Sequence, residues 1–373
     1  MNETIDDATE HVGDEYASSG TTRRAILASG AALTASAIGG CIGGDDDGSD
    51  ATNIAIISSD AGFGDRAFND LALEGLENAQ EEYDIELNQI EETDVANFGD
   101  VQATAAEDND LVVLVGFQHT EDLQENAPEF PDTYWMLIND HVDEPNVAGY
   151  TWANHEMSYL AGVQAATMTS IELQNGDISN APSDNHIGFV GGEEQALIKA
   201  FERSYIAGAE SVDSDIEIST GYAGSFSDPS AGEDVASSQY EAGADIIYHA
   251  AAGTGPGIFD AAQAANRFAV GVDADQSRSL EDYSDVIIGS AVKYINTGTY
   301  DAASAVAEDD FESIQGFNRL GLEEEAVDLV IGQEFEGDMP GELENNLEDA
   351  KQGIRDGDID VPCTHTGCED FGN

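Results

Sequence analysis

The sequence predicts an α/β protein with two lobes, each built on an open, doubly wound parallel sheet. Two observations support this fold class. From about residue 53 onward, short apolar runs bounded by glycine and aspartate alternate with amphipathic segments, as buried parallel strands alternate with their connecting helices. The alternation continues for about 300 residues, which is the expected size of two domains.

The first lobe is predicted from four apolar runs and the segments between them. The helix after the first run is indicated by Leu71, Leu73, Leu76 and Ala79, which are interspersed with glutamates. The four predicted strands cover residues 53–58, 85–90, 111–115 and 134–138. We expect this lobe to comprise residues 53–153, with residues of about 292–323 returning to it.

A second set of predicted elements begins after Tyr150. Its first helix, residues 157–168, is rich in alanine and nearly uncharged, so we expect it to be buried. Strands are predicted at 186–190, 216–220, 245–249, 268–272, 286–290 and 326–331, and helices at 195–209, 231–241, 257–265 and 343–354. One more helix is expected beyond Val292. This lobe would comprise residues 154–291 and about 324–362, followed by a tail, 363–373.

The segment before the lobes indicates export. The pair Arg23-Arg24 precedes an uncharged run of 16 residues, which is shorter than the roughly 20 residues needed to cross a bilayer. The run ends in two glycines and Cys41, an ending that resembles a lipobox, whose cysteine receives a lipid and becomes the new N-terminus. We therefore expect a twin-arginine signal over 1–40, a flexible tether over 41–52, and lipid anchoring on the extracellular face of the cell membrane. An interfacial helix with a buried cysteine is the alternative.

The charge of the chain is strongly unbalanced. Its 77 acidic residues face 11 basic ones, a formal charge of -66, and 71 acidic and nine basic residues follow residue 40. Repulsion on this scale destabilises a compact fold, but a Debye length of ~3 Å at 1 M salt screens most of it. The composition therefore predicts a halophilic protein. It excludes a nucleic-acid partner, because the chain has no basic patch.

The remaining cysteines lie in the tail. Outside the cell, a local disulfide between Cys363 and Cys368 is the expected pairing. A metal site that includes His365 is the alternative. No cofactor is predicted.

Candidate ligand contacts follow the predicted strands, because open parallel sheets bind ligands outside the carboxyl ends of their strands. The chain has only three lysines, and one of them, Lys293, directly follows a strand. The first lobe supplies Asp60, Phe68, Asn69, Phe117 and Asp140, and the second supplies Phe226, Gly253, Asp273 and Lys293. We expect these residues to meet in a cleft between the lobes.

Six segments, in order along the chain, carry a recognisable pattern. They are Asp60–Asn69, which is similar to a Gly/Asp-rich start that ends in Ser-Phe-Asn, and residues 158–162, 187–192, 222–228, 271–276 and 290–293. This pattern resembles the basic membrane protein family, the nucleoside-binding lipoproteins that supply ABC transporters. The resemblance extends from about Asn53 to Pro362.

The resemblance implies a type I periplasmic-binding-protein fold, with a hinge of three crossings and a cleft that closes on a purine nucleoside for delivery to a permease. By position, Phe68 and Phe226 would sandwich the base and Asp140 would bind its edge. Asp273 and Lys293 would hold the ribose, and Gly253 would let the backbone approach closely. Stacking on two aromatic rings suits the π-faces of a purine.

Each of these positions has a simpler structural interpretation. Phe68 can pack under the sheet, Asp273 can cap a helix, and Phe117 and Trp152 can line the cleft or fill the interface between the lobes. Asp60 and Asp65 can be solvated turn residues, and Lys199 more simply anchors its own helix. Trp152 replaces a phenylalanine common in the family, and Asn139 precedes Asp140 where an aliphatic residue is usual.

Two other functions remain as alternatives. A receptor for sugars or other small solutes on the same fold is the nearer one, whereas the two stacking positions favour a nucleoside. A nucleoside hydrolase would require a carboxylate cluster around calcium or a general base. The chain has no Gly-x-Ser-x-Gly elbow and no His-Glu-x-x-His helix, so we expect a binding protein and not an enzyme.

Overall fold

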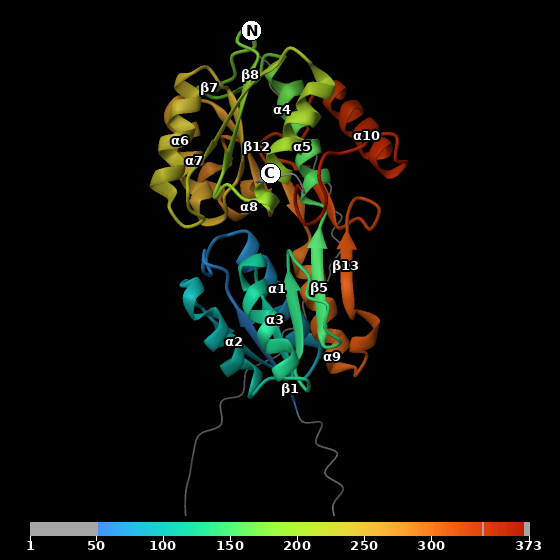
Figure 1. Cartoon of the computed structure of the whole chain (residues 1–373). Helices are drawn as coiled ribbons and strands as arrows, with labels where there is room; N and C mark the ends of the chain where they lie inside the picture. The colour runs from blue at the N-terminus through green and yellow to red at the C-terminus, as the bar shows by residue number, and fades with distance from the viewer. Residues whose placement is uncertain (1–50, 338, 369–373) are drawn as a thin grey trace, which may run out of the picture. The chain divides into compact units, whose positions relative to one another are not determined.

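The computed structural model of the protein describes residues 51–337 and 339–368. Two six-stranded sheets, each covered by helices on both faces, form one compact unit (Figure 1). The predicted fold class, two doubly wound α/β lobes, is confirmed. The export signal with Arg23 and Arg24 and the lipidation site Cys41 lie outside the described residues.

The first sheet is parallel throughout, with the strand order β13-β5-β4-β3-β1-β2. Its strands are β1 (Thr52–Ile57), β2 (Ile85–Ile90), β3 (Leu111–Leu114), β4 (Tyr134–Ile138), β5 (Val147–Trp152) and β13 (Gly316–Leu320). The helices around it are α1 (Phe68–Glu82), α2 (Phe98–Ala106), α3 (Thr120–Glu129) and α9 (Ile295–Ala307).

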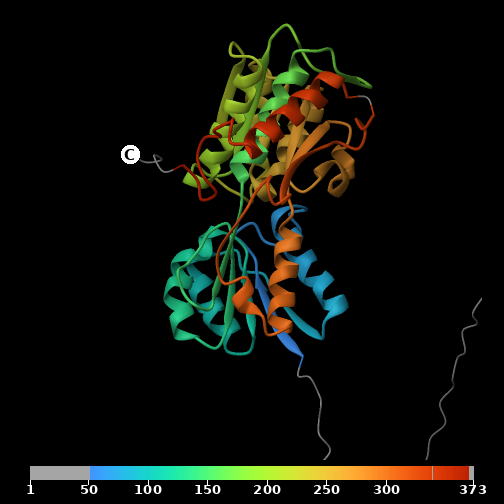
Figure 2. The ribbon, with the colours of Figure 1, turned by 90° about the vertical axis from the view of Figure 1, so that its right-hand side faces the viewer.

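Alternation along β1 explains why helices cover both faces of this sheet. Ile54 and Ile56 pack with α1 and α9 on one face of the sheet. Ala55 and Ile57, the alternate residues of β1, pack with α2 and α3 on the other face. All four last residues of β1 are fully buried, as a continuous apolar run requires. Figure 2 shows α9 lying beside α1 although more than 200 residues separate them in the chain.

The second sheet has the order β14-β12-β11-β10-β8-β9, and only β14 runs antiparallel to its neighbour. Its strands are β8 (His186–Gly191), β9 (Glu217–Tyr222), β10 (Ile246–Ala250), β11 (Phe268–Asp273), β12 (Ile287–Lys293) and β14 (Val327–Ile331). The helices are α4 (Asn154–Thr169), α5 (Ala196–Val212), α6 (Pro229–Glu241), α7 (Gly255–Ala265), α8 (Gln276–Ser279) and α10 (Gly341–Arg355), and a short hairpin joins β6 (Gln174–Asn175) to β7 (Ile178–Ser179).

Helix α4 is buried as its uncharged sequence predicts, with Glu156 its one residue that is not buried. It crosses α5 at two glycines. A Cβ atom on Gly162 would lie 2.0 Å from the carbonyl oxygen of Tyr205, and one on Gly208 would lie 2.0 Å from that of Tyr159. Glycine therefore permits the close packing of the two helices.

The chain passes from one sheet to the other three times, between β5 and α4, between β12 and α9, and between β13 and β14. Strands β5 and β13 were not predicted from the sequence, although they pair with each other at the edge of the first sheet. Among the described residues, no helix is long and apolar enough to span a bilayer.

Candidate ligand-binding site

A cavity lies where the carboxyl ends of strands from both sheets meet. About 490 Å³ between its walls is free of protein atoms, part of it open to solvent. The walls are formed by Ser59, Asp60, Phe68, Phe117, Gln118, Asn139, Leu197, Ile198, Phe201, Phe226, Ala250, Ala251, Ala252, Val272, Asp273 and Lys293. Six of the residues predicted as ligand contacts are thus brought together here: Asp60, Phe68, Phe117, Phe226, Asp273 and Lys293.

Asp273 and Lys293 form the charged part of the cavity. They end the neighbouring strands β11 and β12, and Lys293 Nζ lies 3.0 Å from Asp273 Oδ1. Their side chains are 8% and 2% exposed, so water screens this ion pair little. Lys293 Nζ also donates a hydrogen bond of 3.2 Å to Asn154 Oδ1. Asp273 has a φ of 67°, a left-handed conformation that aspartate adopts more readily than most residues.

Aromatic rings form much of the apolar wall. Lys293 Nζ lies 4.7 Å from the centre of the Phe68 ring and 5.7 Å from that of Phe201. Phe226 packs on Gly192, where a Cβ atom would come within 2.4 Å of the ring. Phe68 and Phe226 are each 7% exposed. The cavity therefore offers both apolar ring surface and a buried charge pair.

The first lobe contributes a polar wall. Gln118 Nε2 donates a hydrogen bond of 2.6 Å to Asp60 Oδ1, which leaves Gln118 Oε1 buried without a partner among the described residues. Asn139 Oδ1 is likewise buried and unpartnered there. Burial, and then the charge of Glu193, raise the pKa of Asp60. These groups present acceptors that a ligand donor can satisfy.

Asp140 does not line the cavity. Its Oδ2 accepts a hydrogen bond from Thr120 Oγ1 and its Oδ1 accepts one from the backbone of His141, both at 2.8 Å. The residue before it, Asn139, occupies the cavity wall instead. Asn139 follows β4 directly and has a φ of 71°, a left-handed conformation at which the chain leaves the strand.

Asn69 does not line the cavity but supports the loop after β1 through the lining residue Ser59. Its Oδ1 accepts from the backbone N–H of Ser59 at 2.8 Å, and its Nδ2 donates to Ser59 Oγ and Asp65 Oδ2. Asp65 in turn accepts from three backbone N–H groups near the start of α1, including that of Ala67. Both residues are therefore structural supports of the site.

Trp152 and Gly253 are also outside the lining residues. Trp152 is fully buried, where it packs against Gly298 of α9, and its ring centre is 6.1 Å from that of Tyr150. A Cβ atom on Gly253 would lie 3.2 Å from the carbonyl oxygen of Phe226. Gly253 thus permits close packing beside the cavity, next to the lining residues at the end of β10.

The sequence interpretation missed the lining residues that resemble ordinary core. Leu197, Ile198 and Phe201 belong to the first turns of α5, where apolar spacing predicts packing against the sheet. Gln118 directly follows the predicted contact Phe117, and its polar amide after a strand was the one feature of these residues that indicated a ligand contact. The order of residues after each strand does not reveal which side chain points inward.

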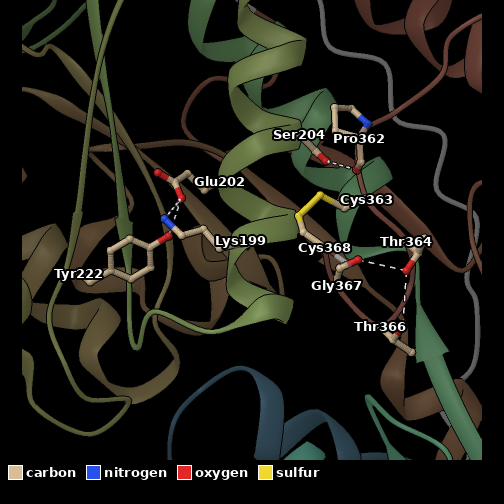
Figure 3. Close-up of a disulfide and its surroundings, with 10 residues drawn as sticks. All are labelled: Lys199, Glu202, Ser204, Tyr222, Pro362, Cys363, Thr364, Thr366, Gly367 and Cys368. Atoms are coloured by element: carbon tan, nitrogen blue, oxygen red, sulfur yellow. Dashed lines mark hydrogen bonds and ion pairs between the residues drawn. A yellow bond between two sulfur atoms is a disulfide. The ribbon is translucent and has the colours of Figure 1, made fainter. Parts of the chain in front are cut away.

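The tail is closed by a disulfide between Cys363 and Cys368 (Figure 3). The backbone N–H of Cys368 donates to the carbonyl of Ala196 at 3.1 Å, and Ser204 Oγ donates to the carbonyl of Pro362 at 2.9 Å. The tail therefore packs along α5. His365 reaches the ring of His155, with ring centres 5.1 Å apart. Within residues 51–337 and 339–368, no group of three His, Cys, Asp or Glu residues is placed to hold a metal ion.

Two α/β lobes that enclose an aromatic and charged cavity between their strand ends define the class of solute-binding proteins. Comparison with known proteins supports this class. A solved structure described as an ABC transporter solute-binding protein, from Aeropyrum pernix, aligns over 84% of this chain and 94% of its own, with a TM-score of 0.75 and 26% identity. A Conexibacter woesei solute-binding protein shares the fold, with a TM-score of 0.64 at 23% identity.

The particular family follows from the sequence match. The model of the family described as "ABC transporter substrate-binding protein PnrA-like" matches residues 51–362, and the chain belongs to this family. A Lactococcus lactis protein named "ABC transporter nucleoside-binding protein BmpA" is 30% identical, over 91% of this chain and 99% of its own. Basic membrane protein A of Borreliella burgdorferi is 29% identical, over 89% and 94% respectively. The predicted family is therefore confirmed.

Proposed function

We propose that the protein binds a purine nucleoside in this cavity without altering it and delivers it to an ABC permease. The observation that carries the proposal is the joint presence of Phe68, Phe226, Asp273 and Lys293 in the wall of one cavity. The name of the Lactococcus lactis relative, a nucleoside-binding protein, supports the same ligand class.

In this proposal the base contacts the aromatic wall. Phe68 and Phe226 come from different lobes and both present ring surface to the cavity. Stacking of a base on an aromatic side chain contributes ~1–3 kcal/mol. A free sugar has no π-face for this interaction, so the rings favour a nucleoside over ribose alone.

The edge of the base meets the polar wall of Asp60, Gln118 and Asn139. The unpartnered oxygens of Gln118 and Asn139 gain hydrogen-bond donors from the base, which removes the cost of leaving them unsatisfied. This wall takes the role that the family resemblance implied for Asp140, whose carboxylate is already hydrogen-bonded to Thr120 and His141.

The ribose is held by the charge pair. A carboxylate accepts hydrogen bonds from two vicinal hydroxyls, and such charge-assisted bonds are stronger than neutral ones. Lys293 holds the Asp273 carboxylate in place at 3.0 Å and is itself held by Asn154. The pair is preorganised before a ligand arrives, so little ordering is needed on binding.

The proposal includes the location of the protein. Export through the twin-arginine signal and lipid attachment at Cys41 would place the binding lobes outside the cell, tethered beside a permease. Outside the cell the protein would meet a medium of concentrated salt. Such a medium screens the repulsion among the 71 acidic residues that, with nine basic ones, follow residue 40.

Calorimetry in 3 M KCl tests the ligand. Inosine, guanosine, adenosine, ribose and free purine bases are titrated separately, and the recovered ligand is analysed by chromatography. We expect a purine nucleoside to bind and to be recovered intact, and Phe226→Ala to weaken binding by ~1–3 kcal/mol. Tight binding of ribose alone would make the protein a sugar receptor, and release of free base would make it a hydrolase.

A further inference from the structure

A polar cluster formed by Lys199, Glu202 and Tyr222 lies beside the cavity without lining it. Lys199 Nζ lies 2.7 Å from Glu202 Oε2 and 4.6 Å from the centre of the Tyr222 ring. Tyr222 Oη donates a hydrogen bond of 2.6 Å to the same Glu202 oxygen. Figure 3 shows Lys199 and Glu202 on α5, directed at the tyrosine of the neighbouring strand.

The cluster is largely shielded from water. The side chains of Lys199 and Glu202 are 16% and 9% exposed, and Glu194 adds a second, exposed carboxylate 3.0 Å from Lys199. Burial alone would raise the pKa of Glu202, but the hydrogen bonds from Lys199 and Tyr222 outweigh it and lower that pKa. The lysine and the neutral tyrosine thus stabilise the charged form of the glutamate, and salt screens the pair of Lys199 and Glu202 less than an exposed pair.

Helix α5 connects the cluster to one wall of the cavity. Its first turns direct Leu197, Ile198 and Phe201 into the cavity, while Lys199 and Glu202, in the same turns, hold Tyr222. An altered position of this part of α5 would therefore change the cavity wall and the tyrosine together.

Tyr222 connects the cluster to Phe226. The rings of Tyr222 and Phe226 pack on two adjacent glycines at the end of β8. A Cβ atom on Gly191 would lie 2.5 Å from the Tyr222 ring, and one on Gly192 would lie 2.4 Å from the Phe226 ring. After Tyr222 the chain continues beside these glycines, because Ala223 and Gly224 donate backbone hydrogen bonds to the carbonyls of Gly191 and Gly192 at 2.9 and 2.8 Å.

The loop of Phe226 is held by hydrogen bonds at its two ends, and the Phe226 ring between them packs on Gly192. Thr254 Oγ1 donates to the carbonyl of Ser225 and accepts from the backbone of Asp228, both at 2.9 Å, which holds the far end. The near end begins at Tyr222, on β9, which is the edge strand of the second sheet. An edge strand is hydrogen-bonded to one neighbouring strand only, so the contacts of Tyr222 with Glu202 and Lys199 add to those that hold this end of the loop.

We propose that Lys199 and Glu202 are positioning residues that act through Tyr222 to hold the Phe226 ring where a base stacks. The inference rests on the proposed function, since it assigns a role to the ring that contacts the base. It explains why one of only three lysines in the chain lies in this helix. Without the cluster, the loop would have to be ordered when the ligand binds, at a cost in affinity.

The test is a double-mutant cycle with inosine as the probe, measured by calorimetry in 3 M KCl. Tyr222→Phe keeps the ring on Gly191 and removes only the hydroxyl. We expect it to raise the Kd about three- to tenfold in the wild-type protein and less than about twofold when Phe226→Ala is already present. Such non-additivity identifies an effect that passes through Phe226, which a general loss of stability does not produce.

Lysine variants complete the experiment. Lys199→Met should raise the Kd by a similar factor, and Lys199→Arg, which keeps the charge, should restore it. Lys351→Met is the matched control, because it removes the same charge from a pair with Asp328 outside the cavity. Additive effects of Tyr222→Phe and Phe226→Ala, or an equal loss in Lys351→Met, would overturn the proposal. Absence of inosine binding by the wild-type protein would instead count against the proposed ligand.

Discussion

The ammonium group of Lys293 lies 4.7 Å from the centre of the Phe68 ring, so a strand end of the second lobe is directly opposite the first helix of the other lobe. The same group pairs with Asp273 at 3.0 Å. The ammonium group therefore contacts both Asp273, which we propose binds the ribose, and Phe68, which we propose stacks on the base. Loss of the lysine would change the surroundings of both residues.

Replacing one member of the buried pair should destabilise the fold more than replacing both. Asp273→Asn keeps a residue that tolerates the φ of 67° but leaves the Lys293 charge unpaired, at a cost of about 3–5 kcal/mol. Adding Lys293→Met should recover part of that loss. Denaturant unfolding in 3 M KCl measures both variants, and an Asp273→Asn protein as stable as the wild type would contradict the pairing. Neither variant should bind inosine tightly.

Acid should destabilise the protein through His119. Its Nε2 donates to the carbonyl of Ser58 at 2.9 Å and its Nδ1 accepts from Gln102, so both nitrogens of the neutral ring are hydrogen-bonded. Burial lowers the pKa of His119 to about 4. The unfolded chain takes up a proton near pH 6.5 while the native state does not, so stability is complete above pH 6.5 and is lost at ~1.4 kcal/mol per unit below it, down to about pH 4.

A comparison of His119→Gln with the wild type isolates this effect, because both share every other titrating group. The free energy of unfolding of each is measured from pH 7.5 to 4. The difference between the two proteins should shrink as the pH falls below 6.5. A difference that stays constant over this range would show that His119 takes up its proton equally in the native and unfolded states, and would contradict the lowered pKa.

Lowering the salt concentration should destabilise the protein. With 71 acidic and nine basic residues after residue 40, repulsion reaches between neighbouring charges at 0.1 M salt, where the Debye length is ~10 Å. We expect the Tm to rise steadily between 0.1 and 3 M KCl. Sucrose at matched osmolality is the control, because it is excluded from the protein surface without screening charge. An equal effect of sucrose, or a flat Tm in KCl, would refute the halophilic interpretation.

The disulfide of the tail should stabilise α5 locally. In the double variant Cys363→Ser, Cys368→Ser, loss of a loop that closes over a separation of five residues should cost roughly 2 kcal/mol. Hydrogen exchange should become faster at the start of α5, where Cys368 donates to the carbonyl of Ala196. Exchange that is unchanged there, in a protein otherwise destabilised, would show that the tail acts elsewhere.

Lipid attachment is tested at Cys41. Wild-type protein should partition with membranes and incorporate lipid label, whereas Cys41→Ser should be released or remain as an uncleaved precursor. Replacing Arg23-Arg24 by two lysines keeps the charge and should block export. Membrane association of Cys41→Ser equal to that of the wild type would exclude the lipid anchor.

The sequence predicted most strands because they are buried on both faces and read as continuous apolar runs, as Leu111–Leu114 does. Strand β13 was missed because it is an edge strand whose sequence, Gly316–Leu320, includes Asn318 and Arg319 and is only partly buried. Strand β5 was missed for a different reason. It lies at the change from one lobe to the other, where the pattern of the next helix begins within two residues.

The site shows a sharper limit. Polar residues follow β4 as the sequence indicates, but Asn139 lines the cavity whereas Asp140 bonds to Thr120. The chain turns here at a φ of 71° on Asn139, and composition does not encode that angle. Likewise, Trp152 was a reasonable aromatic candidate, yet the space beside Gly298 receives its ring, a contact between segments about 150 residues apart.

The three passages of the chain between the sheets have a consequence for synthesis. The first sheet receives its last strand, β13, only after the second sheet has received five of its six, and β14 then completes the second. Neither lobe is therefore complete until the ribosome has translated these last two strands. A nascent chain that stops earlier leaves open edges on both sheets, where other chains can pair. If the chain crosses the membrane only after translation and folding, as the twin arginine predicts, both sheets would be complete before the protein reaches the outside of the cell.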